Sequence, residues 1–219
     1  MVVGNSPARG RMKITILGPT GPTGRQLVAQ ALARGHEVTA FAREPAALPV
    51  HRGLITERGS IADAAALDSA IAGREAVICA LGGKPWRRRE RVCSTAMRHA
   101  VVSMQRHHVR RVVAISTFGA GETGPRVGWF VRHLVLGLML RSEVADKEAM
   151  EAILESSGLD WTVVRVGLLH DGPARGAWRA ADDASMYGMG RIARADVAAF
   201  ILDQLDDASW IRRKPALMD

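Results

Sequence analysis

The stretch "GPTGPTG" (residues 18–24) lies between the apolar run "KITIL" (13–17) and the helix-like segment "RQLVAQALARG" (25–35). Its glycines recur every third residue, which makes the loop one residue longer than the dinucleotide fingerprint G-x-G-x-x-G. A glycine- and proline-rich turn without a ligand is the alternative interpretation. The order of strand, loop and helix at the first strand of the chain favours dinucleotide binding.

Each glycine of this loop has a physical task if a dinucleotide binds there. Gly18 frees the turn out of the strand, Gly21 lets a diphosphate approach the backbone, and Gly24 lets the helix pack closely on the sheet. The helix start adds free N–H groups and a partial positive charge for the phosphates. Thr20 and Thr23 supply hydroxyl donors.

Short apolar segments alternate with helical patterns along the rest of the chain. We expect strands at 13–17, 37–42, 53–59, 75–82, 110–117 and 160–167, and helices at about 23–34, 63–73, 90–107, 142–157 and 193–207. This alternation predicts an α/β fold with βαβ units, that is, a Rossmann-type doubly wound parallel sheet in a single domain. We assign residues 1–11 to a flexible tail and 12–219 to the domain, with substrate loops at 118–141 and 168–190.

The end of the second strand distinguishes the two nicotinamide cofactors. An acidic residue there would accept hydrogen bonds from the ribose 2′-OH, but the sequence reads "AFAREP", with Arg43 at that place. Arginine binds phosphate and offers no acceptor to a hydroxyl. A solvated arginine is the alternative, and the sequence favours NADP(H) as cofactor.

The charge of +8 indicates an anionic partner or basic solvated faces. Arginines gather at 84–91, 106–111 and 211–214, and such runs usually form solvated faces. Nucleic-acid binding is disfavoured because Trp86 alone makes no stacking platform. The same charge suits a phosphorylated cofactor.

The sequence also bears on location and on membranes. The N-terminus lacks the apolar stretch of a signal peptide, and the apolar segment 127–140 is shorter than the about 20 residues of a spanning helix. Cys79 and Cys93 lack metal-ligand spacing and favour a reducing compartment. We expect a cytoplasmic protein without a membrane partner and without a metal site.

Several segments together resemble one family. "MKITILGPTGPTGRQLVAQALARGHEVTAFAREPAAL", "ALGG", "VVAIST", "LESSGLDWTVVRVG" and "IARADVAAFIL" resemble the atypical short-chain dehydrogenases that include NmrA-like proteins and biliverdin-IXβ reductase (flavin reductase). The resemblance implies NADP(H) binding, with Arg43 on the 2′-phosphate, while Ser60 departs from the family's usual aspartate. It implies a cofactor site of Gly18, Thr20, Gly21, Pro22, Thr23, Gly24, Arg43, Ala80, Leu81, Gly82, Ser116, Thr117, Lys147, Val166, Gly167 and Leu168.

The catalytic residues are less clearly indicated. Ordinary short-chain dehydrogenases use a Tyr-x-x-x-Lys pair, in which the tyrosine protonates the substrate oxygen. Lys147 stands where the family's lysine would be, but Glu143 takes the place of the tyrosine. Lys147 is therefore either a nicotinamide-ribose contact or a surface residue. We name Ser116, Lys147 and Tyr187, the single tyrosine of the chain, as catalytic candidates.

The substrate site is expected above the nicotinamide, in the two long loops. Packing under a long loop is the alternative role for each residue proposed there, but together they indicate a flat aromatic or carbonyl substrate. The substrate candidates are Phe118, Trp129, Phe130, His133, His170 and Trp178.

Two functions from different classes follow. The first is an NADPH-dependent reductase of a flavin, quinone or related aromatic carbonyl acceptor, because the cofactor supplies the hydride and orientation provides most of the catalysis. The second is a non-catalytic NADP(H)-sensing regulator of the NmrA-like type. We expect a monomer or a homodimer.

Overall fold

The computed structural model describes residues 10–45, 48–82, 91–121, 123, 140–182 and 190–219. The helices are α1 (Pro22–Ala33), α2 (Ala64–Ile71), α3 (Val92–Arg106), α4 (Arg141–Ser156) and α5 (Arg194–Asp203). The strands are β1 (Lys13–Leu17), β2 (Glu37–Ala42), β3 (Leu54–Arg58), β4 (Ala76–Cys79), β5 (Arg111–Thr117), β6 (Asp160–Val166), β7 (Leu168–His170), β8 (Arg179–Ala181), β9 (Arg191–Ala193) and β10 (Ala216–Met218).

A central sheet has the strand order β3-β2-β1-β4-β5-β6-β10-β8. Its strands pair in parallel except for β8, which runs antiparallel to β10. The chain leaves β1 first toward β2 and β3 and then crosses back to β4 and β5, so the strand order reverses between β1 and β4. This topology confirms the expected doubly wound, Rossmann-type sheet and places the ligand crevice at the carboxyl ends of β1 and β4.

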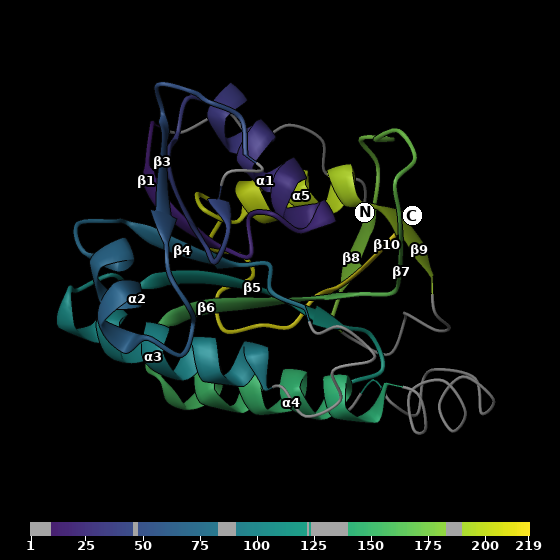
Figure 1. The fold of residues 1–219 in the computed structure, drawn as a ribbon. Helices are drawn as coiled ribbons and strands as arrows, with labels where there is room; N and C mark the ends of the chain where they lie inside the picture. Colours follow the sequence, from purple (N-terminus) through teal and green to yellow (C-terminus); the bar gives the residue numbers. More distant parts are fainter. Residues whose placement is uncertain (1–9, 46–47, 83–90, 122, 124–139, 183–189) are drawn as a thin grey trace.

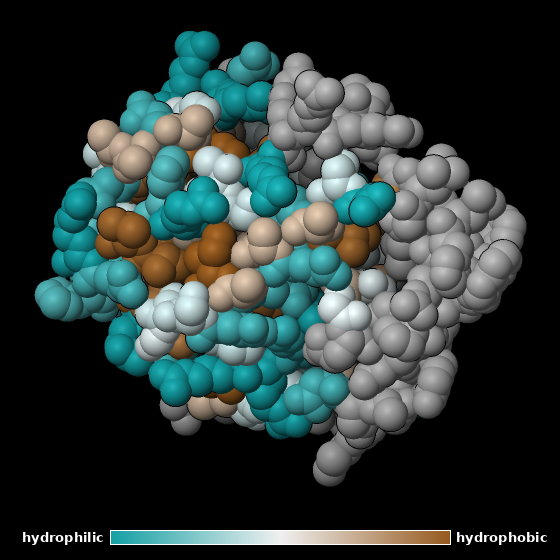
Figure 2. All heavy atoms as spheres, turned by 90° about the horizontal axis from the view of Figure 1, so that it is seen from below, coloured by the Kyte–Doolittle hydropathy of each residue, from teal (hydrophilic) through white to brown (hydrophobic). Residues whose placement is uncertain are grey.

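Helices cover both faces of the sheet, α1 and α5 on one side and α2, α3 and α4 on the other (Figure 1). Each side has its own apolar cluster: Ile14 and Ile16 of β1 face α1 and α5, and Leu17 faces the opposite layer. The inner strands are apolar because parallel strands are buried on both faces. Figure 2 shows the outer surface of the α2–α4 side, where hydrophilic residues surround a hydrophobic area.

The C-terminal third contains four short strands that the sequence analysis does not predict. Strands β7 and β9 form a separate parallel pair, and β8 and β10 extend the central sheet. The predicted substrate loop at 168–190 therefore contains β7 and β8 and is not wholly irregular. Each of these strands has three residues, too few for an alternating pattern to stand out.

In the described part of the basic run at 106–111, the exposed arginines form surface ion pairs and Arg111 is buried. Arg106 and His107 contact Asp68, and Arg110 pairs with Asp160. The buried Arg111 donates to the carbonyl oxygens of Gln204 and Asp160 and to the Thr162 hydroxyl, and burial lowers its pKa to about 10. The expected role of this run as a solvated face is wrong for Arg111, because backbone carbonyls provide its hydrogen bonds.

We expect His36 to make the free energy of unfolding sensitive to mildly acidic pH. Its Nδ1 accepts a hydrogen bond from the Met12 N–H at 3.2 Å, and burial lowers its pKa below the ordinary 6.5. As the pH falls, the unfolded chain protonates His36 before the folded protein does. We therefore expect the contribution of His36 to the free energy of unfolding to be complete above pH 6.5 and to be lost as the pH falls through the folded-state pKa.

Thermal unfolding measured from pH 7.5 to 5 checks this expectation. The His36→Asn variant keeps a side-chain acceptor but does not titrate, so its melting temperature should fall less steeply with acid than that of the wild type. Equal slopes for the two proteins would contradict the assignment.

Across the part of the chain that the structure describes, every helix is too short or too polar to cross a bilayer.

Candidate cofactor-binding site

The loop after β1 shows why its glycines differ in role. Gly18 has φ +81°, and a Cβ added there would lie 2.9 Å from the Ala80 carbonyl oxygen. A Cβ on Gly24 would overlap the Gly18 carbonyl oxygen. Both glycines are therefore required by close backbone approach within the protein itself.

Gly21 is different, because the protein around it leaves room for a side chain. Its φ is −69°, and an added Cβ would meet the Gly18 carbonyl oxygen at an ordinary 3.5 Å. Gly21 nevertheless lines a cavity at the carboxyl ends of β1, β2 and β4. Its missing side chain leaves open space at the backbone, and a diphosphate needs such space.

The N-terminus of α1 suits an anion. Gly21 is the N-cap, Pro22 opens the helix, and no side chain caps it. Proline at this position gives up an N–H that has no partner within the helix, and the following N–H groups keep the positive end of the helix dipole. Thr23 is buried, so the hydroxyl predicted as a ligand donor is largely covered.

A cavity of about 510 Å³ opens at the carboxyl ends of β1, β2 and β4. Of the predicted cofactor residues, Gly18, Thr20, Gly21, Arg43, Ala80, Leu81 and Gly82 line it. Further lining comes from Phe41, Ala42, Gly59, Ser60, Ile61, Ala62, Arg91, Val92 and Thr95, which the analysis of the sequence does not assign to the site.

The charged residues that line this cavity are basic. The described lining residues include Arg43 and Arg91 and no aspartate or glutamate. The Arg58 Nε donates to the Arg43 carbonyl oxygen at 3.2 Å and so braces the chain at the end of β2. Two guanidinium groups without a carboxylate suit a ligand that carries several phosphate charges.

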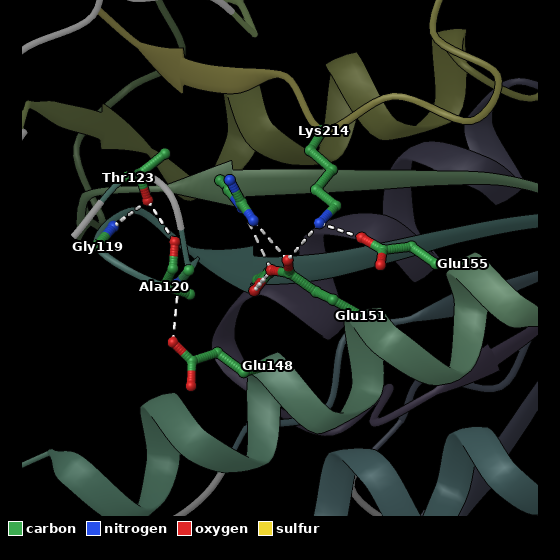
Figure 3. A network of polar contacts seen from close by, with 10 residues as sticks. Gly119, Ala120, Thr123, Glu148, Glu151, Glu155 and Lys214 are labelled. Carbon is green, nitrogen blue, oxygen red and sulfur yellow. Dashed lines mark hydrogen bonds and ion pairs between the residues drawn. The ribbon is translucent and has the colours of Figure 1, made fainter. Parts of the chain in front are cut away.

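Ser116 belongs to a buried polar network at the end of β5 that is centred on Glu151, and Figure 3 shows Glu151 with Lys214 and Glu155. Its hydroxyl donates to Glu151 Oε1 at 2.6 Å, and Arg165 Nη2 donates to Glu151 Oε2 at 2.5 Å. Lys214 Nζ lies 3.3 Å from Glu151 Oε2 and also contacts Glu155. The proton of the predicted catalytic serine is thus directed at Glu151, and Ser116 itself is 1% exposed.

Helix α4, which carries Glu151, also contacts the start of the loop that follows β5. Glu148 of α4 accepts the Gly121 N–H at 2.8 Å. The Thr123 hydroxyl accepts the Gly119 N–H and donates to the Ala120 carbonyl oxygen (Figure 3). These contacts orient the start of the predicted substrate loop.

Lys147 is buried, so its interpretation as a surface residue is wrong. Its Nζ donates to the carbonyl oxygens of Leu81, at 2.7 Å, and Ile115, at 2.6 Å. Glu143, at the place of the family's tyrosine, is half-buried, and desolvation raises its pKa. Burial also raises the pKa of the nearby Cys93 thiol to about 12, so this group is a neutral thiol at physiological pH.

The remaining predicted cofactor residues lie near the ends of β5 and β6. Thr117 is half-buried and Val166 is buried. An added Cβ on Gly167 would overlap the Gly190 carbonyl oxygen, so this glycine is needed for chain packing. Leu168 begins β7 and is 51% exposed.

Two predicted substrate residues are packing residues in the structure. Phe118 is fully buried with Ala216 and Met218. Trp178 packs on the α1/α5 side of the core, edge-on to Phe200 at 6.1 Å between ring centroids. Both side chains fill space against the C-terminal strands and α5, which the sequence alone does not place beside them.

His170 is half-buried on β7, where its Nδ1 accepts the Gly172 N–H at 3.1 Å. The described residues contain no group of three or more potential metal ligands. Trp129, Phe130, His133 and Tyr187 lie outside the described residues.

Sequence reasoning also missed buried residues of α4 that support the surroundings of the site. Asp146 accepts hydrogen bonds from the N–H groups of Cys93 and Ser94, and Glu151 joins Arg165. The carboxylates of "EVADKEAMEA" all resemble a solvated helix face in the sequence. Only the burial of one side of α4 distinguishes the buried carboxylates of Asp146 and Glu151 from the exposed carboxylate of Glu148.

Comparison with known proteins identifies the family of the chain. A family model described as NAD(P)H-binding matches residues 18–208. An uncharacterized chloroplastic protein of Arabidopsis thaliana is 28% identical over 214 residues, which cover 88% of this chain and 71% of that protein. A 3-beta-hydroxysteroid dehydrogenase of Mycolicibacterium neoaurum is 37% identical over 65 residues, which cover 30% of this chain and 18% of that protein.

Solved structures share the fold over nearly the whole chain. A short-chain dehydrogenase/reductase of Veillonella parvula in complex with NADP has a TM-score of 0.81 and 20% identity, and the match covers 95% of this chain and 94% of that one. An anaerobillin reductase of Escherichia coli has a TM-score of 0.79 and 23% identity, with 94% and 96% covered. These likenesses confirm the expected fold.

Proposed function

The chain belongs to the NAD(P)H-binding family, and from that premise we propose that it is an NADPH-dependent reductase of a flavin, quinone or related aromatic carbonyl acceptor. The observation that carries the proposal is the cavity between β1 and β4. It combines the open backbone at Gly21, the uncapped start of α1 and two arginines without a lining carboxylate. These features fit the diphosphate and the 2′-phosphate of NADP(H).

The residues of this chain bind and orient, and NADPH when bound supplies the hydride. Gly18–Gly24 and α1 hold the diphosphate, and Arg43 holds the 2′-phosphate with Arg91 nearby. Glu148 and Thr123 hold residues 119–121, the start of the loop after β5, beside the expected acceptor site. The Ser116 proton is directed at Glu151, and we propose that the proton that completes reduction comes from solvent.

The acceptor class rests on the absence of the tyrosine. Glu143 at its place disfavours chemistry that needs a tyrosine acid, whereas an electron-poor aromatic ring needs mainly orientation against the nicotinamide. One solved structure with the same fold is an anaerobillin reductase. For this chain we propose a flat conjugated acceptor. A cytoplasmic location and a monomeric or homodimeric state remain predictions.

The alternative is a non-catalytic NADP(H) sensor. Two observations favour it: Glu143 replaces the tyrosine, and Ser116 is buried with its proton on Glu151. Both functions require NADPH binding. They differ in whether the bound nucleotide is oxidised when acceptors are added.

We therefore test the function by titrating the purified protein with NADPH and NADH by fluorescence, and then adding FMN and a simple quinone. The reductase predicts NADPH oxidation that depends on the acceptor and on the protein concentration. Binding without oxidation over a broad panel of flavins, quinones and conjugated carbonyl compounds would overturn the reductase and favour the sensor.

The Arg43→Ala variant tests the cofactor preference. We expect about 10- to 100-fold weaker NADPH binding and unchanged NADH binding, because a charge-assisted contact to phosphate is lost. Arg52→Ala removes the same charge from an exposed residue outside the cavity and serves as the control. An equal loss for both nucleotides would contradict a contact between Arg43 and the 2′-phosphate.

A further inference from the structure

Two adjacent residues of α4 hold one wall of the nucleotide cavity without lining it. This wall, which we call the β4–α3 wall, consists of residues 80–82 after β4 and residues 91–95 at the start of α3. Its members Leu81, Arg91, Val92 and Thr95 face the cavity, whereas Asp146 and Lys147 do not. Both α4 residues are nearly fully buried, at 4% and 5% exposure.

Asp146 fixes the start of α3. The N-cap residue Arg91 makes no capping hydrogen bond through its side chain. Instead Asp146 Oδ2 accepts the Cys93 N–H at 2.8 Å, and Oδ1 accepts the Ser94 N–H at 3.0 Å and the Ser94 hydroxyl at 2.5 Å. A carboxylate from another helix thus provides the cap that the local sequence lacks. The capped residues lie between Val92 and Thr95, so Asp146 sets where the lining side chains stand.

Lys147 fixes the other part of the wall. Its ammonium group donates to the carbonyl oxygens of Leu81, which follows β4, and of Ile115, which lies in the neighbouring strand β5. Two of the three ammonium protons of Lys147 thereby donate to backbone carbonyl oxygens. The contact ties the segment that follows β4 to β5 and holds Leu81 at the cavity.

We infer that Asp146 and Lys147 are positioning residues that shape the adenosine end of the nucleotide site through the β4–α3 wall. The inference rests on the proposed NADP(H) site. It gives Lys147 a role different from the nicotinamide-ribose contact that the family resemblance implies. The two roles predict different ligand dependence, because 2′,5′-ADP contains the adenosine end and lacks the nicotinamide ribose.

The test is calorimetric titration of the full chain with 2′,5′-ADP. We expect Asp146→Asn, which sets an amide NH₂ against a backbone N–H, and Lys147→Met to weaken binding about tenfold or more. If Lys147 acts on the nicotinamide ribose instead, Lys147→Met will bind 2′,5′-ADP like the wild type and lose affinity for NADPH alone. That result would overturn the inference for Lys147.

Asp196→Asn is the matched control. Asp196 of α5 is also buried and also accepts two consecutive backbone N–H groups, those of Arg175 and Gly176, but it lies outside the cavity lining. We expect this variant to lose thermal stability as Asp146→Asn does and to keep wild-type affinity for 2′,5′-ADP. Weakened binding in both variants would show a general loss of stability and would overturn the inference.

Ser94→Ala covers the case in which the buried charge variants fail to fold. It removes one of the three hydrogen bonds to Asp146, and we expect a two- to fivefold loss of 2′,5′-ADP affinity in a folded protein. Unchanged affinity would contradict the role of Asp146. If wild-type protein fails to bind 2′,5′-ADP, the proposed function itself fails, whereas wild-type binding that all variants retain refutes only the positioning roles.

Discussion

Replacing Gly24 with alanine is expected to destabilise the protein by about 3 kcal/mol or more and to abolish NADPH binding. The added Cβ would overlap the Gly18 carbonyl oxygen and lie 2.9 Å from the carbonyl carbon of Pro19. These are backbone atoms, which cannot rotate away as a side chain can. Either α1 moves off the sheet or the phosphate loop is displaced. Chemical denaturation and a fluorescence titration with NADPH measure the two effects.

Gly21→Ala is the matched control for this prediction. The protein leaves room for its methyl group, so we expect a loss of stability of about 1 kcal/mol or less, as for alanine at an N-cap. NADPH binding should still weaken about 10- to 100-fold, because the methyl group occupies the space where the diphosphate approaches the backbone. Full NADPH affinity in Gly21→Ala would contradict the placement of the diphosphate at this loop.

Glu151→Gln is expected to lower the free energy of unfolding by about 3–5 kcal/mol, because it leaves the buried Arg165 guanidinium facing a neutral amide. The substitution preserves the shape of the side chain, so packing changes little. The loop after β5 lies beside this network, and we expect acceptor turnover to fall as well. Urea denaturation measures the first effect and NADPH oxidation in the presence of acceptor measures the second.

Glu155→Gln serves as the comparison on the same helix. Glu155 also contacts Lys214, but its side chain is 45% exposed. An exposed ion pair contributes little, so we expect a change of about 1 kcal/mol or less. If both variants lose the same stability, burial of the Glu151–Arg165 pair is not what makes Glu151 important.

The strand and helix pattern around "GPTGPTG" determined the Rossmann-type fold, and it is the basis for proposing residues 18–24 as the cofactor loop. This was possible because the signals are local. A strand, a glycine turn and a helix start are set by consecutive residues, and Arg43 follows directly from the end of the second strand. In the structure, Gly18, Gly21 and Arg43 line one cavity at the carboxyl ends of β1, β2 and β4.

The tertiary structure alone decided what the polar residues of α4 do. In the sequence Asp146 and Glu151 resemble other charged residues of a solvated helix, Lys147 is open between a ribose contact and a surface residue, and Phe118 and Trp178 resemble substrate contacts. The fold buries one side of α4 against α3 and the strand ends, which turns these charges into caps, clamps and an ion pair. The partners lie between 14 and 66 residues away along the chain, and a pattern of neighbouring residues carries no information about such contacts.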